Sequence, residues 1–345
     1  MDELVSGQNS ITLADLQALR DAVGDGPLLV MTHDNPDPDA LASGSALRAL
    51  VTLAWGIPVE LYYCGLVTRA ENKAMLEILT PDWKPLNDLS DIYRIPIRAM
   101  VDTQPGVGNN SLPPELAPQI VFDHHHPNHS NLEAVQFVDI RTAMGATSSI
   151  LYQYLETAGI DPDPLLATAI FYGIQTDTQG LSRGGTLADQ EIYFKLLVKI
   201  DRQKLIQVTQ AGLPRQYFQA FSDGLKATRV FGQAVVSFLG KLPRPDFVAE
   251  MADTLIRLEG VRAVLSMGYH GNLLYLSLRT RNSKKDAGSI IHWIVSPNGK
   301  AGGHGTIAGG QISIADKPVY ELAAEVQSKF LAVMGESQNG EDLLT

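Results

Sequence analysis

The residues of this sequence with the clearest chemistry are groups of Asp and His side chains, each of which follows a short apolar run. They are His33, Asp37 and Asp39 in the stretch 33–39, then Asp102, then the run Asp123-His124-His125, and finally Asp177. Imidazole and carboxylate donors together suit Mn, Fe, Zn or Mg, and a majority of carboxylates favours Mn. So many carboxylates in one pocket would repel each other unless cations lay between them. Two divalent ions about 3.5–4 Å apart would neutralise the carboxylates and could clamp a phosphoryl group.

The elements that must position these groups are predicted to form a parallel sheet. Apolar runs indicate strands at Leu28–Met31, Val59–Tyr63, Ile97–Val101 and Gln119–Phe122, and helical spacing indicates helices at 11–23, 40–55, 145–158 and 164–175. Short strands that alternate with helices predict an α/β fold with a doubly wound parallel sheet. Ligands of such sheets bind outside the carboxyl ends of the strands, where His33, Asp102 and Asp123 are expected to lie.

From about residue 230 the pattern becomes that of a smaller α+β domain. Strands are expected at Val235–Leu239, Ala263–Tyr269 and Leu273–Arg279, and helices at 247–258 and 317–334. The glycines between 299 and 310 are interpreted as a loop whose backbone N–H groups approach an anion. The predicted division is a domain at 1–195, a helical connector at 196–229, a domain at 230–335 and a polar, frayed tail at 336–345, with the active site in the cleft between the two domains.

Composition and charge narrow the class of protein. Hydrophobic residues make up 45% of the 345 residues, which is enough for a sizeable core. The net charge of −11 argues against a protein that coats long duplex DNA. Cys64 is the single cysteine, so an intramolecular disulfide and a cysteine-based zinc site are excluded. The sequence has neither a recognisable signal peptide nor a long apolar run, so we expect a cytoplasmic protein that does not bind membranes.

The motifs in this order resemble the DHH phosphoesterase superfamily, in the branch that carries a C-terminal DHHA1 domain. The stretch 33–40 is similar to the HxxPDxDA motif, and Val101-Asp102-Thr103 to the second motif. Asp123-His124-His125 with Asn128 is similar to DHHxxN, and residues 173–178 to GxxTDT. Near the other end, Gly302-Gly303-His304 with Ala308-Gly309 is similar to the GGHxxxAG signature of DHHA1 domains.

The resemblance implies a two-metal hydrolase, with Mn²⁺ preferred and Mg²⁺ or Co²⁺ as alternatives. His33, Asp37 and Asp102 would then hold one metal ion. Asp39, Asp102, His124 and Asp177 would hold the other, so that Asp102 bridges the two, and a metal-bridging water or hydroxide would be the nucleophile. His125 would contact the scissile phosphate, and Asp123 would fix the tautomer of the histidine pair.

The same resemblance implies which side chains bind the rest of the substrate. Arg279 offers a bidentate fork to phosphate, and His304 in the glycine-rich run can donate to a phosphate. The predicted substrate-binding residues are Asn128, Arg183, Arg279, Gly302, Gly303 and His304.

The expected substrates are small nucleotides. The resemblance is to the branch of oligoribonucleases, pAp phosphatases and cyclic-dinucleotide phosphodiesterases, so short oligonucleotides, linear or cyclic dinucleotides and pAp are candidates. The segment 179–185 departs from the family pattern, which leaves the choice among these substrates open. Hydrolysis of pyrophosphate or polyphosphate is one alternative, and a catalytically weak nucleotide-binding protein is another. A homodimer is compatible with the base rate of symmetric assemblies.

Overall fold

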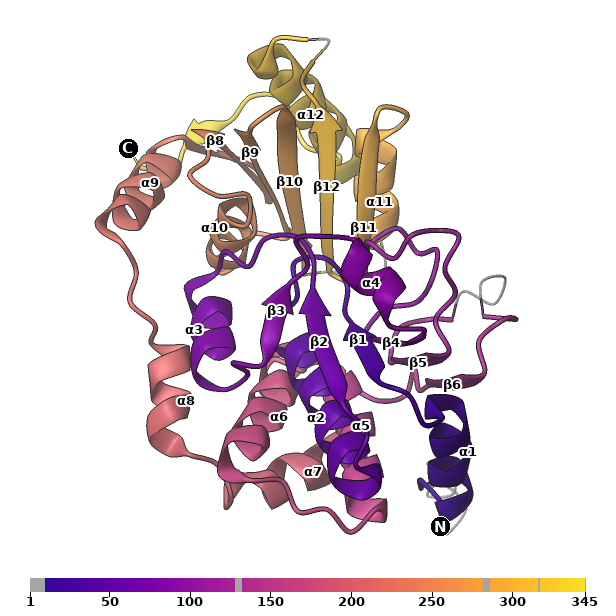
Figure 1. Ribbon diagram of the computed structural model, residues 1–345. Coiled ribbons are helices and arrows are strands. Elements are labelled where there is room, and N and C mark those ends of the chain that lie inside the picture. The colour runs from indigo at the N-terminus through magenta and orange to yellow at the C-terminus, as the bar shows by residue number, and fades with distance from the viewer. Residues whose placement is uncertain (1–9, 128–131, 282–285, 316, 345) are drawn as a thin grey trace, which may run out of the picture. The chain divides into compact units, whose positions relative to one another are not determined.

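The computed structural model describes residues 10–127, 132–281, 286–315 and 317–344, and the side chain of His304 is outside the description. The chain divides into two compact units, Met1–Ala211 and Gly212–Thr345. Each unit builds its own sheet (Figure 1) and its own hydrophobic cores, one on each face of that sheet.

In the described part of the N-terminal unit, six parallel strands pair in the order β3-β2-β1-β4-β5-β6. The strand order reverses between β1 and β4, which is the point where open parallel sheets leave room for a ligand at their carboxyl edge. The strands are β1 (Leu28–Met31), β2 (Val59–Tyr63), β3 (Trp83–Pro85), β4 (Ile97–Val101), β5 (Ile120–Asp123) and β6 (Phe137–Ile140).

Helices cover both faces of this sheet, which explains why its central strand β1 is apolar and buried along its whole length. Leu28 and Val30 of β1 belong to a core with α2, α5 and α6, while Leu29 and Met31 belong to a second core with Ile92 of α4. Figure 1 shows α2, α5 and α6 grouped beside one another. The helices of this unit are α1 (Leu13–Val23), α2 (Pro38–Trp55), α3 (Ala70–Ile78), α4 (Ser90–Arg94), α5 (Thr147–Thr157), α6 (Pro164–Asp177), α7 (Leu187–Leu197) and α8 (Arg202–Thr209).

The described part of the C-terminal unit has a mixed seven-stranded sheet in the order β11-β12-β10-β9-β8-β7-β13, in which only β8 and β9 pair in parallel. Alternate residues of its strands face two different cores, one with α11 and α12 and the other with α9 and α10. Its strands are β7 (Thr228–Phe231), β8 (Ala234–Lys241), β9 (Ala263–His270), β10 (Leu273–Thr280), β11 (Gly299–His304), β12 (Ile307–Ser313) and β13 (Glu341–Asp342). Its helices are α9 (Arg215–Lys226), α10 (Phe247–Leu255), α11 (Ala287–Val295) and α12 (Val319–Met334).

The predicted fold class is confirmed: the protein is an α/β protein with a six-stranded parallel sheet followed by a separate mixed-sheet domain. Strands β3 and β6 were not predicted from the sequence. Both lie at the edges of the sheet, and β3 has three residues and ends at Pro85, so neither carries the long apolar run of a buried strand.

Two local expectations in the C-terminal unit are wrong. The glycine-rich run is a β-hairpin rather than a loop, because β11 pairs with β12 in register, with Gly302 opposite Gly309 and Gly303 opposite Ala308. The C-terminal segment is not frayed throughout, since Glu341 and Asp342 pair with β7. In both places backbone pairing orders residues whose side chains gave no strand signal.

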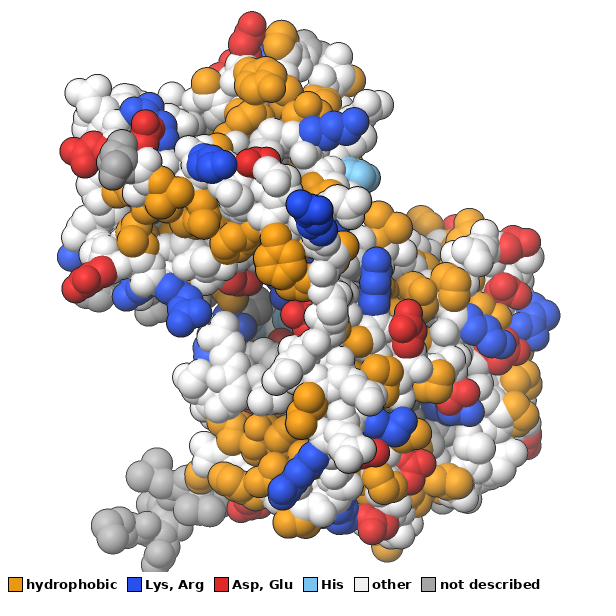
Figure 2. Space-filling view, turned by 90° about the vertical axis from the view of Figure 1, so that its left-hand side faces the viewer, with side chains coloured by type: hydrophobic (Ala, Val, Ile, Leu, Met, Phe, Trp, Pro, Cys, Tyr) orange, Lys and Arg blue, Asp and Glu red, His pale blue; other side chains and the backbone are white. Residues whose placement is uncertain are grey.

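The surface mixes charges of both signs. On the face in Figure 2, Lys and Arg side chains are interspersed with Asp and Glu side chains and with exposed hydrophobic ones. Among the described residues, every helix is too short or too polar to traverse a lipid bilayer.

Candidate metal centre

The first set of polar residues is positioned by the turn from β1 into α2. His33 and Asp37 stand in that turn, and Asp37 caps α2 by accepting from the backbone N–H of Ala40 at 3.0 Å. Asp39 lies in the first helical turn and is buried. Pro38 at the start of the helix and the Asp37 cap fix where α2 begins, and so fix the direction of both carboxylates.

Asp102 follows the last residue of β4 and lies in the middle of the site. Its backbone has a φ of 58°, a left-handed conformation that is uncommon for a residue with a side chain. Asp102 Oδ2 lies 3.6 Å from His33 Nε2, and Asp102 Oδ1 lies 3.6 Å from His124 Nε2. The two oxygens of one carboxylate therefore face histidines from two different strand ends, as a bridging ligand must.

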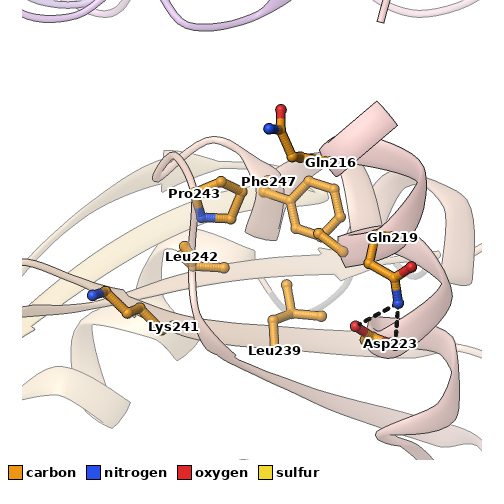
Figure 3. A pocket seen from close by; sticks show the side chains of 9 residues that line it. Gln216, Gln219, Asp223, Leu239, Lys241, Leu242, Pro243 and Phe247 are labelled. Carbon is orange, nitrogen blue, oxygen red and sulfur yellow. Dashed lines mark hydrogen bonds between the residues drawn. The ribbon is translucent and has the colours of Figure 1, made fainter. Parts of the chain in front are cut away.

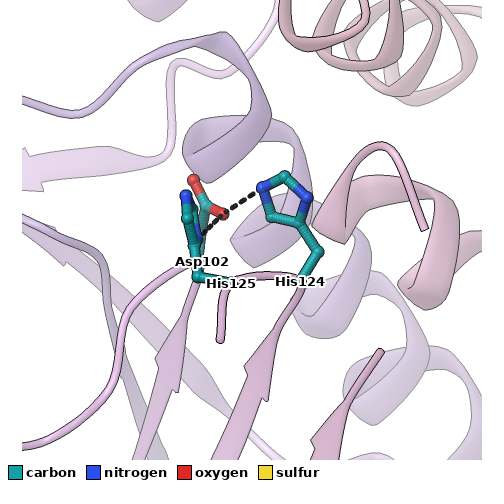
Figure 4. Close-up of side chains that lie close together, drawn as sticks. All are labelled: Asp102, His124 and His125. Carbon is teal, nitrogen blue, oxygen red and sulfur yellow. Dashed lines mark ion pairs between the residues drawn. The ribbon is translucent and has the colours of Figure 1, made fainter. Parts of the chain in front are cut away.

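The run at the end of β5 is organised by Asp123. Asp123 Oδ1 accepts from His125 Nδ1 at 2.8 Å and from the backbone N–H of His124 at 2.8 Å. Asp123 Oδ2 accepts from Gln104 Nε2 at 2.7 Å. Figure 4 shows Asp102 beside the two histidine rings, with His125 Nδ1 3.8 Å from Asp102 Oδ1. Burial lowers the pKa of His125, but Asp123 and Asp102 outweigh burial and raise this pKa to about 9.

Asp177 is the last residue of α6, so this ligand comes from a helix end and not from a strand end. Its Oδ2 lies 3.2 Å from His124 Nε2. Burial, followed by the charge of Asp37, raises the pKa of Asp177 to about 7. Arg183 lies close by, since its Nη2 donates to the backbone carbonyl of Asp177 at 3.5 Å.

The structure thus brings together all six residues predicted as metal ligands. They form overlapping groups whose possible ligand atoms lie within 4.8 Å of one another, and Asp102 and His124 are each shared between groups. The groups are His33 with Asp37 and Asp102, Asp39 with His124 and Asp177, and Asp102 with His124 and His125.

The charges of this donor set fit bound cations. Burial and then the charges of Asp102 and Asp177 raise the pKa of Asp39 well above its usual range. Burial lowers the pKa of His33, but Asp102 and Asp37 outweigh burial and raise it well above its usual value. Asp39 and His33 therefore hold protons more tightly than free side chains do, because several carboxylates lie close together. Divalent cations could replace those protons.

Several supporting groups were missed at the level of sequence. The N-terminus of α5 donates to Asp39, from the backbone N–H of Thr147 at 2.7 Å and of Ser148 at 2.9 Å. Thr147 Oγ1 donates to Asp102 Oδ1 at 2.9 Å. A helix N-terminus is a natural anion site, but its partner is more than a hundred positions away in the chain, so no local pattern could identify it.

The predicted substrate-binding residues have mixed outcomes. Arg279 is buried in the C-terminal unit, where its Nε donates to Asp253 and its Nη1 donates to Ser277 Oγ at 2.9 Å. Gly302 and Gly303 lie in β11, as described above. Asn128 and the side chain of His304 lie outside the described residues. The shared cleft between the domains stays a prediction.

A pocket of about 390 Å³ lies in the C-terminal unit, and none of the residues that line it is a predicted site residue (Figure 3). Its apolar floor is formed by Leu239, Leu242 and Phe247, and Gln219 donates to Asp223 at 3.2 Å on its rim. The pocket carries side chains of α9, β8 and α10, and no sequence motif marks it.

Comparisons with known proteins find similarity to a family model over the part of the chain that carries most of the metal centre. Residues 27–174 match the model of the DHH family, N-terminal domain. An uncharacterized protein of Methanocaldococcus jannaschii is 32% identical over 319 residues, which are 90% of this chain and 64% of that protein, so the chain spans less than two thirds of its relative's length. The crystal structure of an exopolyphosphatase-related protein from Bacteroides fragilis has the same fold, with a TM-score of 0.77 at 14% identity over 95% of this chain and 99% of that chain.

Proposed function

Because residues 27–174 form a DHH family domain, we propose that this protein is a two-metal hydrolase of phosphoester bonds in small nucleotides. The observation that carries the proposal is the position of Asp102, whose two carboxylate oxygens each lie 3.6 Å from a different histidine. The DHH family and this cluster of candidate ligands together support a phosphoesterase.

His33, Asp37 and Asp102 would hold one divalent ion, and Asp39, Asp102, His124 and Asp177 the other. Such ions, when bound, supply an activated water at neutral pH and neutralise charge on the phosphoryl group. We propose Mn²⁺, because carboxylates outnumber imidazoles in the donor set, with Mg²⁺ or Co²⁺ as alternatives. Thiolate-preferring metals are disfavoured by the donor set.

His125 is the proposed contact of the protein with the scissile phosphate. Its Nδ1 is held by Asp123 Oδ1 at 2.8 Å, and Nε2 is the nitrogen that we propose contacts the substrate. The hydrogen bond to Asp123 raises the pKa of the ring and so favours the protonated form, which can donate to a phosphate oxygen. Asp123 is in turn held by Gln104, so the ring direction is set before substrate binds.

The C-terminal unit is the proposed holder of the rest of the nucleotide, as a DHHA1 domain. Arg279, Gly302, Gly303 and His304 are its proposed contacts, together with Asn128 and Arg183 of the N-terminal unit. Arg279 already has Asp253 as a partner, so a phosphate would have to compete with that carboxylate or share the guanidinium with it. We further propose that the protein acts in the cytoplasm, independently of long duplex DNA and of membranes, and as a homodimer.

The substrate class is tested by a panel of short nucleotides and phosphoanhydrides. Purified chain with Mn²⁺ should release AMP from pApA, and Asp102→Ala should abolish the release. Pyrophosphate and polyphosphate belong in the same panel, because the relative from Bacteroides fragilis is named as exopolyphosphatase-related and the metal ligands suit both bond types. Faster phosphate release from pyrophosphate than AMP release from pApA would reverse the substrate assignment.

A further inference from the structure

Asp189 is a charged residue in the core that the predicted site does not include. It lies in the first turn of α7 and is completely buried. Its Oδ2 accepts from the backbone N–H of Thr186 at 2.9 Å and from Thr186 Oγ1 at 2.7 Å, which forms a helix capping box. Its Oδ1 is buried without a hydrogen-bond partner among the described residues. A capping box alone does not require a completely buried carboxylate. The burial of Asp189 therefore indicates a second role for this side chain.

Asp189 has a further hydrogen-bond partner, which lies in the backbone of the loop before α5. Asp189 Oδ2 also accepts from the backbone N–H of Gly145 at 2.8 Å. The carbonyl of the preceding residue, Met144, lies 3.2 Å from His124 Nδ1. The Gly145 N–H and the Met144 carbonyl are the two ends of a single planar peptide unit. One peptide group therefore connects the carboxylate of Asp189 to the ring of a candidate metal ligand.

This connection has a chemical consequence for His124. A carboxylate that accepts from a peptide N–H polarises the unit and makes its carbonyl a stronger acceptor. A stronger acceptor at Met144 holds the proton of His124 on Nδ1 and leaves the lone pair on Nε2. Nε2 is the atom that faces Asp177 Oδ2 at 3.2 Å and Asp102 Oδ1 at 3.6 Å. Ligating histidines in metalloproteins are commonly oriented by a carboxylate or carbonyl on the other ring nitrogen.

The same contact also fixes the loop in space. A Cβ atom at Gly145 would lie 2.7 Å from Thr178 Cγ2, 2.9 Å from Asp189 Oδ2 and 2.9 Å from the carbonyl of Gly184. The peptide unit is thus packed tightly against the segment that follows Asp177. Two positions further on, Thr147 donates to both Asp39 and Asp102.

We propose that Asp189 is a positioning residue of the metal centre, which acts on His124 through the Met144–Gly145 peptide unit. This inference rests on the proposed function, because it assigns His124 as a metal ligand. It adds a buried carboxylate, outside all the sequence motifs, to the groups that set metal affinity.

The test is Mn²⁺ binding to the metal-stripped full chain, measured by isothermal titration calorimetry. Asp189→Ala should weaken Mn²⁺ binding roughly 10- to 100-fold, as the loss of an outer hydrogen-bond partner of a ligand does. Asp189→Asn keeps an oxygen for the Gly145 N–H but loses the charge, so its affinity should fall between those of Asp189→Ala and the wild type. In the Mg²⁺-loaded chain, the ¹⁵N resonances of the His124 ring should show a proton on Nδ1 in the wild type and a weaker hydrogen bond at that nitrogen in Asp189→Ala.

Thr186→Ala is the matched control, because it removes a hydroxyl from the same capping box and leaves the Gly145 contact in place. It should lower thermal stability and keep Mn²⁺ affinity close to that of the wild type. Wild-type Mn²⁺ affinity in both folded Asp189 variants would overturn this inference alone, and so would an equal loss of affinity in Thr186→Ala. A wild-type chain that binds no Mn²⁺ would overturn the proposed function and this inference with it.

Discussion

At the scale of single residues, Asp102 joins the two halves of the proposed metal centre. It follows β4 directly, is 3% exposed and has a left-handed backbone at φ 58°. Such a conformation in a residue with a Cβ persists only where the surroundings hold it, and here its N–H donates to the carbonyl of Phe122 at 2.9 Å. The neighbouring strand therefore supports the backbone at the position where the carboxylate must face both histidines.

Asp102→Asn should remove the charge of the bridging ligand while keeping its shape. We expect Mn²⁺-dependent hydrolysis of pApA to fall by more than ~100-fold. Mutating a residue that only hydrogen-bonds to a metal ligand lowers metal affinity or activity by about 10- to 100-fold, and Asp102 is itself a proposed ligand. Asp34→Asn is the matched control, since Asp34 likewise lies beyond the carboxyl end of a strand, here β1, but it accepts from Ser111 Oγ and belongs to none of the ligand groups. Steady-state kinetics of both variants give the comparison, and equal activities would remove Asp102 from its proposed role.

Metal binding should depend on pH through Asp177. Burial and the nearby Asp37 raise the pKa of Asp177 to about 7, so below that pH the metal-free carboxyl holds a proton that Mn²⁺ must displace. Mn²⁺ affinity should therefore weaken as pH falls through about 7, and proton release should be larger at about pH 6 than at about pH 8. Calorimetry in buffers of different ionisation enthalpy measures the released protons, and equal release at both pH values would contradict the assignment.

At the scale of elements, the sequence predicts the site well wherever a strand delivers a ligand. Asp102 and Asp123 stand at the ends of apolar runs that became β4 and β5, because a buried strand must be apolar and its carboxyl end need not be. Thr147, Gln104 and Asp189 could not be found in this way. Each acts on a residue from a distant part of the chain, and that pairing is set by packing rather than by local pattern.

Arg279 illustrates the same limit in the C-terminal unit. From sequence, an arginine at the end of a predicted strand can be interpreted as a phosphate ligand. The sequence does not tell whether its guanidinium is exposed or already paired with a carboxylate. Its partner, Asp253, comes from α10, twenty-six positions away, so the pairing follows from how α10 packs on the sheet. The glycines of β11 were predicted to form a loop for a related reason. The pairing of β11 with β12 is made by backbone hydrogen bonds, which the side-chain pattern does not predict.

The β11–β12 hairpin offers a matched pair of glycine substitutions. Gly303 has a φ of 140°, and a Cβ there would lie 2.4 Å from Ala308 Cα, whereas Gly302 has open space around it. Gly303→Ala should destabilise the hairpin by about 2–3 kcal/mol, and Gly302→Ala by less than about 1 kcal/mol. Hydrogen exchange of the β11 and β12 peptides in the full chain measures both values, and equal protection in the two variants would contradict the strand pairing.

At the scale of the whole molecule, the net charge of −11 is compatible with a phosphorylated substrate. Asp37, Asp39, Asp102 and Asp177 are the proposed metal ligands among the acidic residues, and two divalent cations would offset their charge where phosphate binds. The segment 226–300 has eleven Lys and Arg residues against five Asp and Glu residues, and it belongs to the unit proposed to hold the nucleotide.

Mn²⁺ should stabilise the N-terminal unit selectively, because all six candidate ligands lie within Met1–Ala211. A ligand that binds only the folded state adds about 2.7 kcal/mol at a hundredfold excess over its dissociation constant. Hydrogen exchange with and without Mn²⁺ should show slower exchange at 33–40, 102–104 and 144–148 and little change in β8, β9 and β10. Protection confined to the C-terminal unit would mean that the metal binds elsewhere.

The central claim is that one chain holds two divalent ions that support phosphoester hydrolysis. The most direct measurement titrates Mn²⁺ into the metal-stripped chain and follows bound metal and AMP release from pApA together. Binding should saturate at about two ions per chain, with activity appearing as the second ion binds. A chain that binds no Mn²⁺, or that saturates and cleaves neither pApA nor any other member of the substrate panel, would contradict the claim.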